Sequence, residues 1–306
     1  MLSIIIPAYN EEEVLEEFYR RIVGVVSKIG LPYELIFVND GSKDRTLQLL
    51  TSLSQQNEHL VIIDLSRNFG KEIAVSAGID FCRGDAVVII DADLQDPPEL
   101  IPELIEQWRL GYDNVYARRI SREGESKLKK LTAFLFYRSI RGMTHIDIPA
   151  DTGDFRLLSR RAIDALKQLP ERNRFMKGLY AWIGFSAIAV DYHRDSRYAG
   201  KTKWNYWKLW NFALEGITSF TEVPLKLASY VGGLMAFVSF LYGAYIIIKT
   251  FILGNDVPGY PSLIVTILFL GGIQLVFIGV LGEYLGRAFA EIKQRPLYFV
   301  NKIIKK

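Results

Sequence analysis

Two long uncharged segments in the C-terminal third most strongly limit what this chain can fold into. Residues 227–248 and 257–282 contain no charged side chain. Each is longer than the roughly 20 apolar residues that a helix needs to cross the hydrocarbon core of a bilayer. Two buried helices of a soluble protein are the alternative, but core helices rarely have uncharged runs of this length. The sequence therefore predicts two transmembrane helices.

Charges around these two segments predict their orientation. The connection between them carries only Lys249 and Asp256, whereas basic residues gather before the first segment and after the second. By the positive-inside rule, we expect both ends of the pair in the cytoplasm. The N-terminal residues MLSIIIPAYNEEE have no basic start and meet acids early, so we expect no signal peptide there.

Charge and cysteine content narrow the compartment and the partners. The formal net charge of +3 is too small to suggest nucleic acid, and the basic residues cluster near the predicted membrane segments instead. The single cysteine, Cys82, excludes an internal disulfide and is typical of a reducing compartment.

Residues 1–120 alternate short apolar runs with amphipathic stretches. We predict strands over 2–6, 33–38, 60–65 and 86–91, and helices over 11–30, 43–56 and 70–84. This alternation predicts an α/β fold with a mostly parallel, doubly wound sheet. In such sheets ligands bind beyond the carboxyl ends of the strands. We therefore expect the site among the polar segments that follow the four strands.

The segment after the fourth strand carries an unusual group of acids. Asp91 and Asp93 are two residues apart, so on extended backbone their side chains lie on one side and could hold a cation that bridges a diphosphate. Mg²⁺ or Mn²⁺ is the expected ion, because the three histidines are scattered and suggest no zinc site. The alternative is that these acids only form a turn. Pro97 and Pro98 shape the entry to the next helix.

Beyond residue 120 the pattern changes. Residues 121–143 form a basic amphipathic stretch, which either lies on an anionic membrane surface or is an ordinary solvated helix. Residues 153–169 predict a short strand that continues into a helix. Trp204, Trp207 and Trp210 precede the first predicted span, where tryptophan suits the headgroup layer, although core packing is the alternative.

Five segments in order carry a family resemblance: IIIPAYNEEE, VNDGSKDRT, SRNFGKEIAVSAGID, DADLQDPPE and TGDFRLLSRRAIDAL. Together with the two late spans, they closely resemble the family 2 glycosyltransferases of the GT-A fold. Within that family the chain looks like the polyprenyl-phosphate glycosyltransferases, which include dolichyl-phosphate mannosyl- and glucosyltransferases. It resembles the bactoprenol glucosyltransferase branch most.

The resemblance implies the domain organisation. A GT-A, Rossmann-like catalytic domain would span residues 1–200, and an amphipathic juxtamembrane helix would span 201–226. A two-helix transmembrane domain over 227–285 and a cytoplasmic tail over 286–306 would follow. The protein would lie in the bacterial plasma membrane with its catalytic domain and both termini in the cytoplasm. Glycines in the spans permit close helix packing and suggest a homo-oligomer: Gly232, Gly233, Gly271, Gly272 and Gly279.

The resemblance also assigns roles to residues. Asp93 matches the metal ligand, with Asp91 and Gln95 as further metal or sugar contacts, and Asp154 matches an acid near the acceptor. The residues that match donor-binding positions are Pro7, Ala8, Tyr9, Asn10, Glu11, Asp40, Lys71, Asp91 and Gln95. The residues that match phosphate-binding or lid elements are Arg118, Arg156, Arg174, Arg197 and Lys201. Each has a plainer alternative, such as a turn former for Asp40, a helix cap for Asp154 and a solvated surface charge for the basic residues.

The implied reaction is inverting transfer of a sugar, glucose from UDP-glucose in the first instance, to a polyprenyl phosphate such as undecaprenyl or dolichyl phosphate. The partners would be a nucleotide sugar, the lipid phosphate and the membrane, with Mg²⁺ or Mn²⁺ as cofactor. A mannosyl, N-acetylglucosaminyl or aminopentosyl transferase remains an alternative. A processive polysaccharide synthase would need more spans than two. A non-catalytic membrane scaffold for nucleotide sugars is a further alternative. It would be distinguished by nucleotide binding without sugar transfer.

Overall fold

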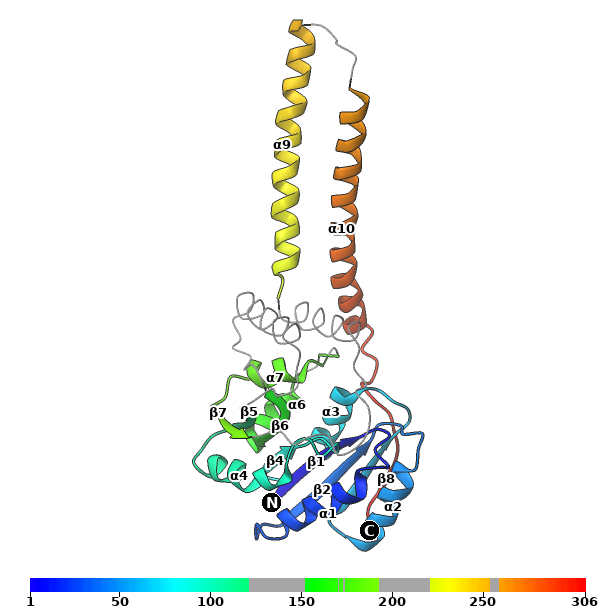
Figure 1. Ribbon diagram of the computed structural model, residues 1–306, viewed down its shortest axis with the longest axis vertical. Coiled ribbons are helices and arrows are strands. Elements are labelled where there is room, and N and C mark those ends of the chain that lie inside the picture. The colour runs from blue at the N-terminus through cyan, green and yellow to red at the C-terminus, as the bar shows by residue number, and fades with distance from the viewer. Residues whose placement is uncertain (121–151, 170, 173, 193–220, 254–258) are drawn as a thin grey trace. The chain divides into compact units, whose positions relative to one another are not determined.

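The computed structural model describes residues 1–120, 152–169, 171–172, 174–192, 221–253 and 259–306 (Figure 1). The chain divides into two compact units. One comprises Met1–Gly216 together with Arg295–Lys306, and the other comprises Ile217–Gln294. The last residues of the chain therefore belong to the same unit as the first.

The first unit is built on an eight-stranded sheet in the described residues, in the order β7-β5-β6-β4-β1-β2-β3-β8. Its centre is parallel: β1 (Leu2–Ala8) pairs with β2 (Tyr33–Asn39) and β4 (Ala86–Ile89), and β2 pairs with β3 (Leu60–Leu65). The four predicted strands and the mostly parallel sheet are thus confirmed. β4 ends earlier than predicted, so Asp91 lies beyond the strand.

Four further strands complete the sheet. β6 (Thr152–Ser159) runs antiparallel between β4 and β5 (Asn114–Arg119), and β7 (Ala187–Tyr192) pairs parallel with β5. β8 (Val300–Ile304) pairs antiparallel with β3 at the opposite edge. The segment 286–306, expected as a tail, therefore contains the end of a helix and this edge strand.

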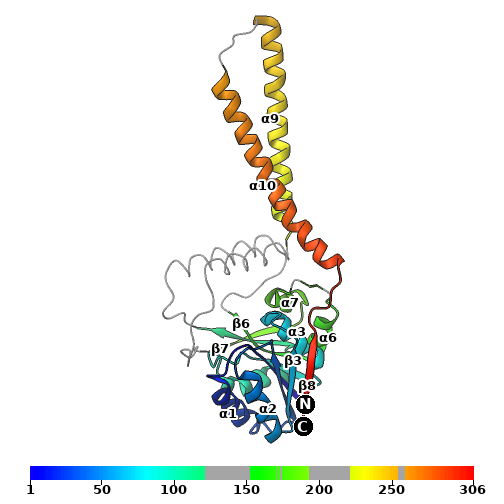
Figure 2. The ribbon, with the colours of Figure 1, turned by 90° about the vertical axis from the view of Figure 1, so that its right-hand side faces the viewer.

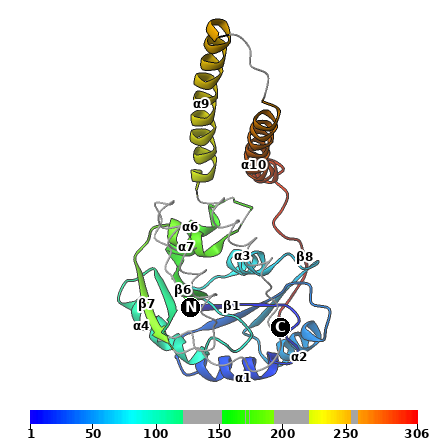
Figure 3. The same ribbon diagram turned by 45° about the horizontal axis from the view of Figure 1, so that its top comes forward.

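Helices cover both faces of the sheet (Figure 3). One face carries α1 (Leu15–Val26), α2 (Thr46–Gln56), η1 (Pro98–Leu100) and α4 (Ile101–Arg109). The other face carries α3 (Lys71–Phe81), α6 (Arg160–Lys167) and α7 (Met176–Trp182). The three helices predicted before residue 90, and the strand that continues into a helix after residue 152, are confirmed with shorter bounds.

Alternation along β1 divides the core into two layers. Ile4 and Ile6 are buried in one cluster with Phe18 of α1. Ile5 points to the opposite face, because successive strand residues alternate between faces. There it meets α3 at Gly78, where an added Cβ would lie 2.3 Å from the Ile5 Cγ2 atom. The glycine therefore lets α3 pack directly on the sheet.

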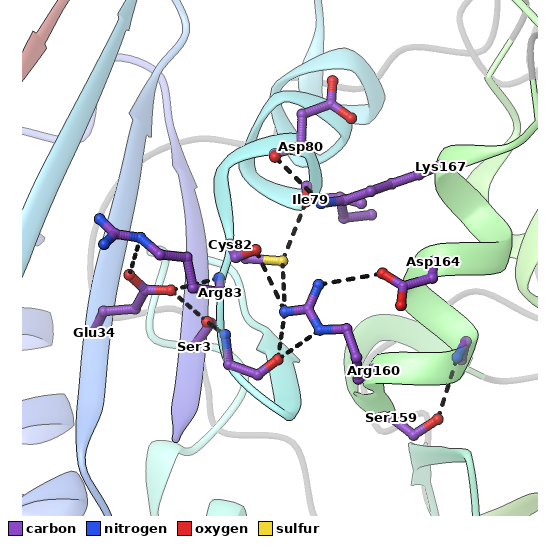
Figure 4. A network of polar contacts seen from close by, with 12 residues as sticks. Ser3, Glu34, Ile79, Asp80, Cys82, Arg83, Ser159, Arg160, Asp164 and Lys167 are labelled. Atoms are coloured by element: carbon purple, nitrogen blue, oxygen red, sulfur yellow. Dashed lines mark hydrogen bonds and ion pairs between the residues drawn. The ribbon is translucent and has the colours of Figure 1, made fainter.

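A polar network fixes the start of β4, at the edge opposite the strand exits (Figure 4). The Ser3 hydroxyl donates to Glu34 Oε1 at 2.6 Å and accepts from the Gly84 amide at 2.7 Å. Glu34 Oε1 also accepts from the Arg83 amide at 2.8 Å. Arg160, at the start of α6, donates from Nε to the Gly84 carbonyl at 2.9 Å. These contacts tie β1, β2, β4 and α6 together where β4 begins. Because β4 is short, a fixed start also fixes the position of its other end.

The second unit consists of two long helices, α9 (Val223–Leu253) and α10 (Tyr260–Ile292). Within them, Val223–Ile246 and Ser262–Ile292 are long and apolar enough to cross a membrane. Most of their large apolar side chains are exposed, such as Phe240 at 73% and Leu275 at 71%, whereas the core helix of a soluble protein would bury them. The two predicted helices are confirmed, and their exposed apolar surface indicates association with a membrane.

Contacts between α9 and α10 use one glycine of the predicted set. A Cβ at Gly232 would lie 3.5 Å from the Phe277 ring, so this glycine faces the partner helix. The Tyr284 hydroxyl donates to the Thr221 carbonyl at 2.6 Å and joins the two ends of the pair. The predicted amphipathic stretch 121–143, most of the predicted juxtamembrane helix 201–226 and its tryptophans lie outside the described residues.

Candidate active site

The exits of β1 and β2 are joined by hydrogen bonds. Asn10, with a φ of 53° that asparagine tolerates better than most residues, accepts from the Lys43 amide at 2.8 Å through Oδ1. The Glu11 amide donates to the Thr46 hydroxyl at 2.9 Å. Pro7 and buried Ala8 end β1, and the Ala8 carbonyl accepts from the Asp40 amide at 2.9 Å. The first and second predicted loops therefore form one surface at the carboxyl edge of the sheet.

Asp40 organises the third loop, residues 66–70, which we name the donor loop after the role that the sequence predicts for it. Its carboxylate accepts from the Phe69 amide at 2.7 Å and from the Gly70 amide at 3.0 Å. Burial raises the pKa of Asp40, and these two amides partly oppose the shift. In this structure Asp40 holds backbone, and its predicted contact with base or ribose stays a prediction.

Gly41 allows the second loop to approach the donor loop closely. Its φ is 64°, and a Cβ at this position would lie 2.4 Å from the Arg67 carbonyl carbon. No other residue type fits both the left-handed backbone and this separation without displacing the loop. Asp40 and Gly41 together therefore explain why an Asp-Gly pair ends the second strand.

A lysine and two acids meet beyond the end of β4. Lys71, the first residue of α3, donates from Nζ to Asp91 Oδ2 at 2.7 Å and to Asp154 Oδ2 at 2.5 Å. The antiparallel pairing of β6 brings the acids together: Ile89 pairs with Arg156, and the same register carried two residues further sets Asp91 opposite Asp154. Three residues predicted for the site therefore form one cluster.

Electrostatics within this cluster follow from burial and pairing. Burial raises the pKa of Asp91 to about 6, although Lys71 lowers it. Burial acts in the same direction on Asp154, but Lys71 and Lys177 outweigh it and hold the pKa of Asp154 well below its ordinary value. Burial disfavours the Lys71 ammonium, yet Asp154 and Asp91 keep its pKa well above the ordinary value. Asp154 is therefore a firmly charged anion and a weak base.

Sequence reasoning missed a further acid beside this cluster. Glu72 follows Lys71 in the first turn of α3. Burial and the charge of Asp154 raise the pKa of Glu72 to about 8. Its place next to Lys71 in the GKE triplet was the signal that could have pointed to it.

Asp93 and Gln95 lie in a tight turn directly after Asp91. Asp93 Oδ1 accepts from the Gln95 amide at 3.1 Å, and buried Leu94 between them has a φ of 59°. A leucine in the left-handed region is uncommon and strained. Asp93 follows Asp91 by two residues, and its charge is one of those that raise the pKa of Asp91.

The carboxylate oxygens at this place fit a divalent cation whose coordination is completed by a bound substrate. Among the described residues, no group of three or more His, Cys, Asp or Glu side chains could by itself hold a metal ion. Mg²⁺ is usually bound by one or two carboxylates plus substrate phosphates and water, without an all-protein cage. The carboxylates of Asp91 and Asp93 would supply the oxygen donors for such a site, and this role stays a prediction.

The third acid of the fourth loop has a structural role. Buried Asp96 accepts a hydrogen bond from the Tyr192 hydroxyl at the end of β7 and lies 3.9 Å from an Arg119 guanidinium nitrogen. Arg119 Nε in turn donates to the Tyr192 oxygen at 3.2 Å. Asp96 therefore joins the fourth loop to β5 and β7.

Arg156 lies in the interior behind Asp154. It is 4% exposed, its guanidinium carbon lies 3.8 Å from the centre of the Tyr180 ring, and it donates to the Gly153 carbonyl at 3.0 Å. Asp154 Oδ1, Arg156 Nε and the Tyr180 hydroxyl are buried and have no hydrogen-bond partner among the residues that the structure describes. The predicted phosphate contact of Arg156 stays a prediction, and its observed contacts hold the backbone beside Asp154.

The remaining predicted basic residues lie apart from the cluster or are not described. Arg118 forms two hydrogen bonds with Asp191 of β7, at 2.6 and 2.9 Å, on the exposed side of the sheet edge. Arg174 donates to the Leu169 carbonyl at 2.9 Å. Arg197 and Lys201 lie outside the described residues. Their proposed roles toward a phosphate stay predictions.

Comparison with known families identifies the class of protein. Residues 3–167, which contain the strand exits and the acids described above, match the family described as Glycosyl transferase family 2. Residues 223–288, which include most of α9 and α10, match the family described as GtrB C-terminal hairpin. The chain belongs to glycosyl transferase family 2 and is a glycosyltransferase.

Similar proteins extend over nearly the whole chain. An uncharacterised glycosyltransferase of Synechocystis is 57% identical, over 99% of this chain and 95% of its own. A prophage-derived bactoprenol glucosyl transferase of Shigella flexneri is 48% identical, over 98% of this chain and 97% of its own. A prophage bactoprenol glucosyl transferase homologue of Escherichia coli is 47% identical, over 99% of both chains.

Among solved structures, glucosyl-3-phosphoglycerate synthase from Mycobacterium tuberculosis, in complex with Mn²⁺, uridine diphosphate and phosphoglyceric acid, is 21% identical. The similarity covers 71% of this chain and 76% of that chain, with a TM-score of 0.49. Such a distant likeness says nothing about the ligands of this chain.

Proposed function

We propose that this protein transfers glucose from UDP-glucose to a polyprenyl phosphate at the membrane surface, with inversion at the anomeric carbon. The observation that carries the proposal is the cluster of Lys71, Asp91 and Asp154 beyond the end of β4, with Asp93 in the adjoining turn. The near full-length likeness to bactoprenol glucosyl transferases supports the choice of sugar and acceptor.

The donor would bind along the joined strand exits. In a nucleotide sugar, the sugar is bonded to the outer phosphate of a nucleoside diphosphate. When that bond breaks and the nucleoside diphosphate departs, negative charge builds on the outer phosphate. A divalent cation held by Asp93, with Asp91 and Gln95 nearby, would supply positive charge where that negative charge develops. The residues of the first loop, Asp40 and the donor loop would hold the nucleotide.

The acceptor requires little help from a base. A phosphate monoester has its second pKa at ~6, so the phosphate group is already largely a dianion at neutral pH. The low pKa of Asp154, caused by Lys71 and Lys177 against the effect of burial, makes it unsuited to take up a proton. We therefore assign Asp154 to orientation: it holds Lys71 and stands opposite Asp91 at the carboxyl edge of the sheet.

The membrane helices bring this chemistry to a lipid substrate. A polyprenyl phosphate keeps its head group at the bilayer surface, and a protein anchored there meets it by diffusion in two dimensions. We propose that the catalytic unit and both chain ends lie in the cytoplasm of a bacterial cell. One observation supports placing both chain ends on the same side of the membrane: residues before and after the helical pair belong to one compact unit.

Association of copies through the helices stays a prediction. Gly232 packs within the pair, whereas a Cβ added at Gly233, Gly271, Gly272 or Gly279 would meet no atom within 4 Å. These four glycines leave room for a close approach by another helix.

The test is sugar transfer by the purified full-length protein. Labelled UDP-glucose, Mg²⁺ and undecaprenyl phosphate should yield an acid-labile lipid-linked sugar. The Asp93→Ala variant should lower the rate by about a hundredfold or more, because charge on the departing diphosphate loses its counter-charge. A panel of other nucleotide sugars, run in parallel, identifies the donor.

The matched control is Asp164→Ala, which removes an exposed acid of α6 whose partner is Arg160 at 3.4 Å. This variant should transfer sugar at the wild-type rate. Full activity of Asp93→Ala would remove the metal role. Nucleotide binding without transfer to any lipid phosphate would favour the membrane scaffold instead.

A further inference from the structure

After the second membrane helix, the chain returns to the sheet of the first unit. Strand β8 lies beside β3 at the sheet edge (Figure 2). The pairing is antiparallel, with Ile62 opposite Ile304 and Leu65 opposite Val300, and an irregularity occurs at Asp64 and Leu65. Without β8, the edge of β3 would expose unpaired backbone groups. The last residues of the chain therefore complete the catalytic sheet.

A buried carboxylate joins β8 to the exit of β2. Asp64 of β3 is 4% exposed and accepts two side-chain hydrogen bonds. One comes from Asn39 Nδ2 at 2.7 Å and the other from Asn301 Nδ2 at 2.9 Å. Asn39 is the residue immediately before Asp40, which holds the donor loop. Asn301 therefore helps to fix the residue on which the loop contacts depend.

The same C-terminal segment holds both elements that flank the donor loop. The loop leaves β3 at Ser66, whose amide donates to the Phe299 carbonyl at 2.9 Å. The loop enters α3 at Lys71, and near the other end of α3 Asp80 Oδ2 accepts from the Tyr298 hydroxyl at 2.7 Å. Residues 298–301 thus contact β3 and α3 at once, on the two sides of the five-residue loop.

We propose that residues 298–301 are positioning residues for the donor site: they fix the donor loop where it leaves β3, and they hold α3, so that the nucleotide sugar meets a preformed surface. This inference rests on the proposed function in one respect, the assignment of residues 66–70 to the donor. Held at Ser66 and by Asp40, the loop loses less freedom on binding, and preorganisation of this kind strengthens binding. The same contacts would also help to position Lys71, because it is the first residue of α3.

The test compares two substitutions on β8. Asn301→Asp places a second carboxylate against Asp64, and Asn301→Ala only removes the hydrogen bond. Lys305→Ala is the control, because Lys305 follows the end of β8 and its side chain is exposed. Each full-length variant is assayed for the KM of UDP-glucose, for kcat, and for hydrogen exchange at the amides of Phe69 and Gly70.

We expect Asn301→Ala to raise the donor KM by about fivefold, as loss of one partly buried hydrogen bond to a carboxylate suggests, and Asn301→Asp to raise it further. The value of kcat should change less than KM, because the acids and Lys71 remain. The amides of Phe69 and Gly70 should exchange faster in both variants, while those of α1 keep their rates. Lys305→Ala should match the wild type in every measurement.

Unchanged exchange at Phe69 and Gly70, together with an unchanged donor KM, would overturn the proposal. Should Asn301→Asp not fold, the milder Asn301→Ala decides the question alone. The exchange measurement needs neither sugar nor lipid. Suppose that the loop amides exchange faster in the Asn301 variants but the wild type transfers no sugar. That result would refute the proposed function and leave the link between β8 and the loop standing.

Discussion

Lys71 shows at the scale of a single residue how burial and pairing compete. Its side chain is 41% exposed, whereas that of Asp154 is 9% exposed, so the lysine bridges a buried acid and a more accessible one. A buried carboxylate without a counter-charge would be strongly unfavourable. The lysine keeps Asp154 ionised and at the same time lowers the pKa of Asp91, whose burial has the opposite effect.

This competition predicts a pH dependence. Burial raises the pKa of Asp91 to about 6, so its charged form is lost as the pH falls through that value, and transfer should decline on the acid side. In Lys71→Met the group that lowers this pKa is gone, so the decline should begin at a higher pH. At pH 7 we expect the rate to fall by about twofold or more, because a rise of one pKa unit would leave about half of Asp91 charged. Rates measured from pH 5 to 8 check both effects.

Lys28→Met is the control for this pH series, because Lys28 is exposed and follows α1 on the other face of the sheet. It changes the net charge by the same amount. An acid limb at the same pH in Lys71→Met and in the wild type would contradict the assignment to Asp91.

At the scale of elements, an antiparallel strand within a parallel sheet builds the site. The start of β6 meets the end of β4 because the two run in opposite directions. A parallel β6 would have placed Asp154 at the far edge, next to the network of Ser3 and Glu34. That network fixes the beginning of β4, so one edge of the sheet anchors the strand and the other carries the chemistry.

Close packing of α3 on β1 yields a prediction about stability. Gly78→Ala adds a Cβ 2.3 Å from Ile5 Cγ2, so α3 must move away from the sheet. We expect a loss of about 1–3 kcal/mol of unfolding free energy, as for other overpacked cores. In Gly24→Ala, the same change on α1, the Cβ meets no atom within 4 Å, and higher helix propensity should stabilise by up to ~1 kcal/mol. Thermal unfolding in detergent compares the two, and equal midpoints would contradict the packing argument.

At the scale of the whole molecule, the chain leaves the catalytic unit before α9 and rejoins it after α10. Arg295–Lys306 belongs to the same compact unit as Met1–Gly216. A single unit cannot lie on both sides of a membrane, so a pair of spanning helices must begin and end on one side. By the positive-inside rule, the basic residues at both ends predict that this side is the cytoplasm.

Single cysteines test this topology in intact cells. The introduced thiol of Asp256→Cys, in the connection between the helices, should react with a membrane-impermeant reagent added from outside. That of Lys305→Cys should react only after the membrane is made permeable, because the end of the chain lies with the catalytic unit. The wild type is the control, since its one cysteine, Cys82, is buried. Labelling of Lys305→Cys from outside would reverse the assignment.

The sequence alone determined the features that depend on local pattern. Apolar runs of strand length before residue 91, uncharged runs of membrane length after 226, and the polar residues that follow each strand are all visible in order along the chain. Parallel strands end at one edge of a sheet, so the sequence could also predict that Lys71, Asp91 and the early loops share a site.

Only the tertiary structure decided which of these residues meet and what each one does. Asp96 pairs with Tyr192, Arg118 with Asp191 and Asn301 with Asp64, and no local pattern distinguishes them from their neighbours. Such contacts depend on strand order and register between segments far apart in the chain. A shift of one residue in register turns every side chain to the other face, so partner choice is a property of the assembled sheet.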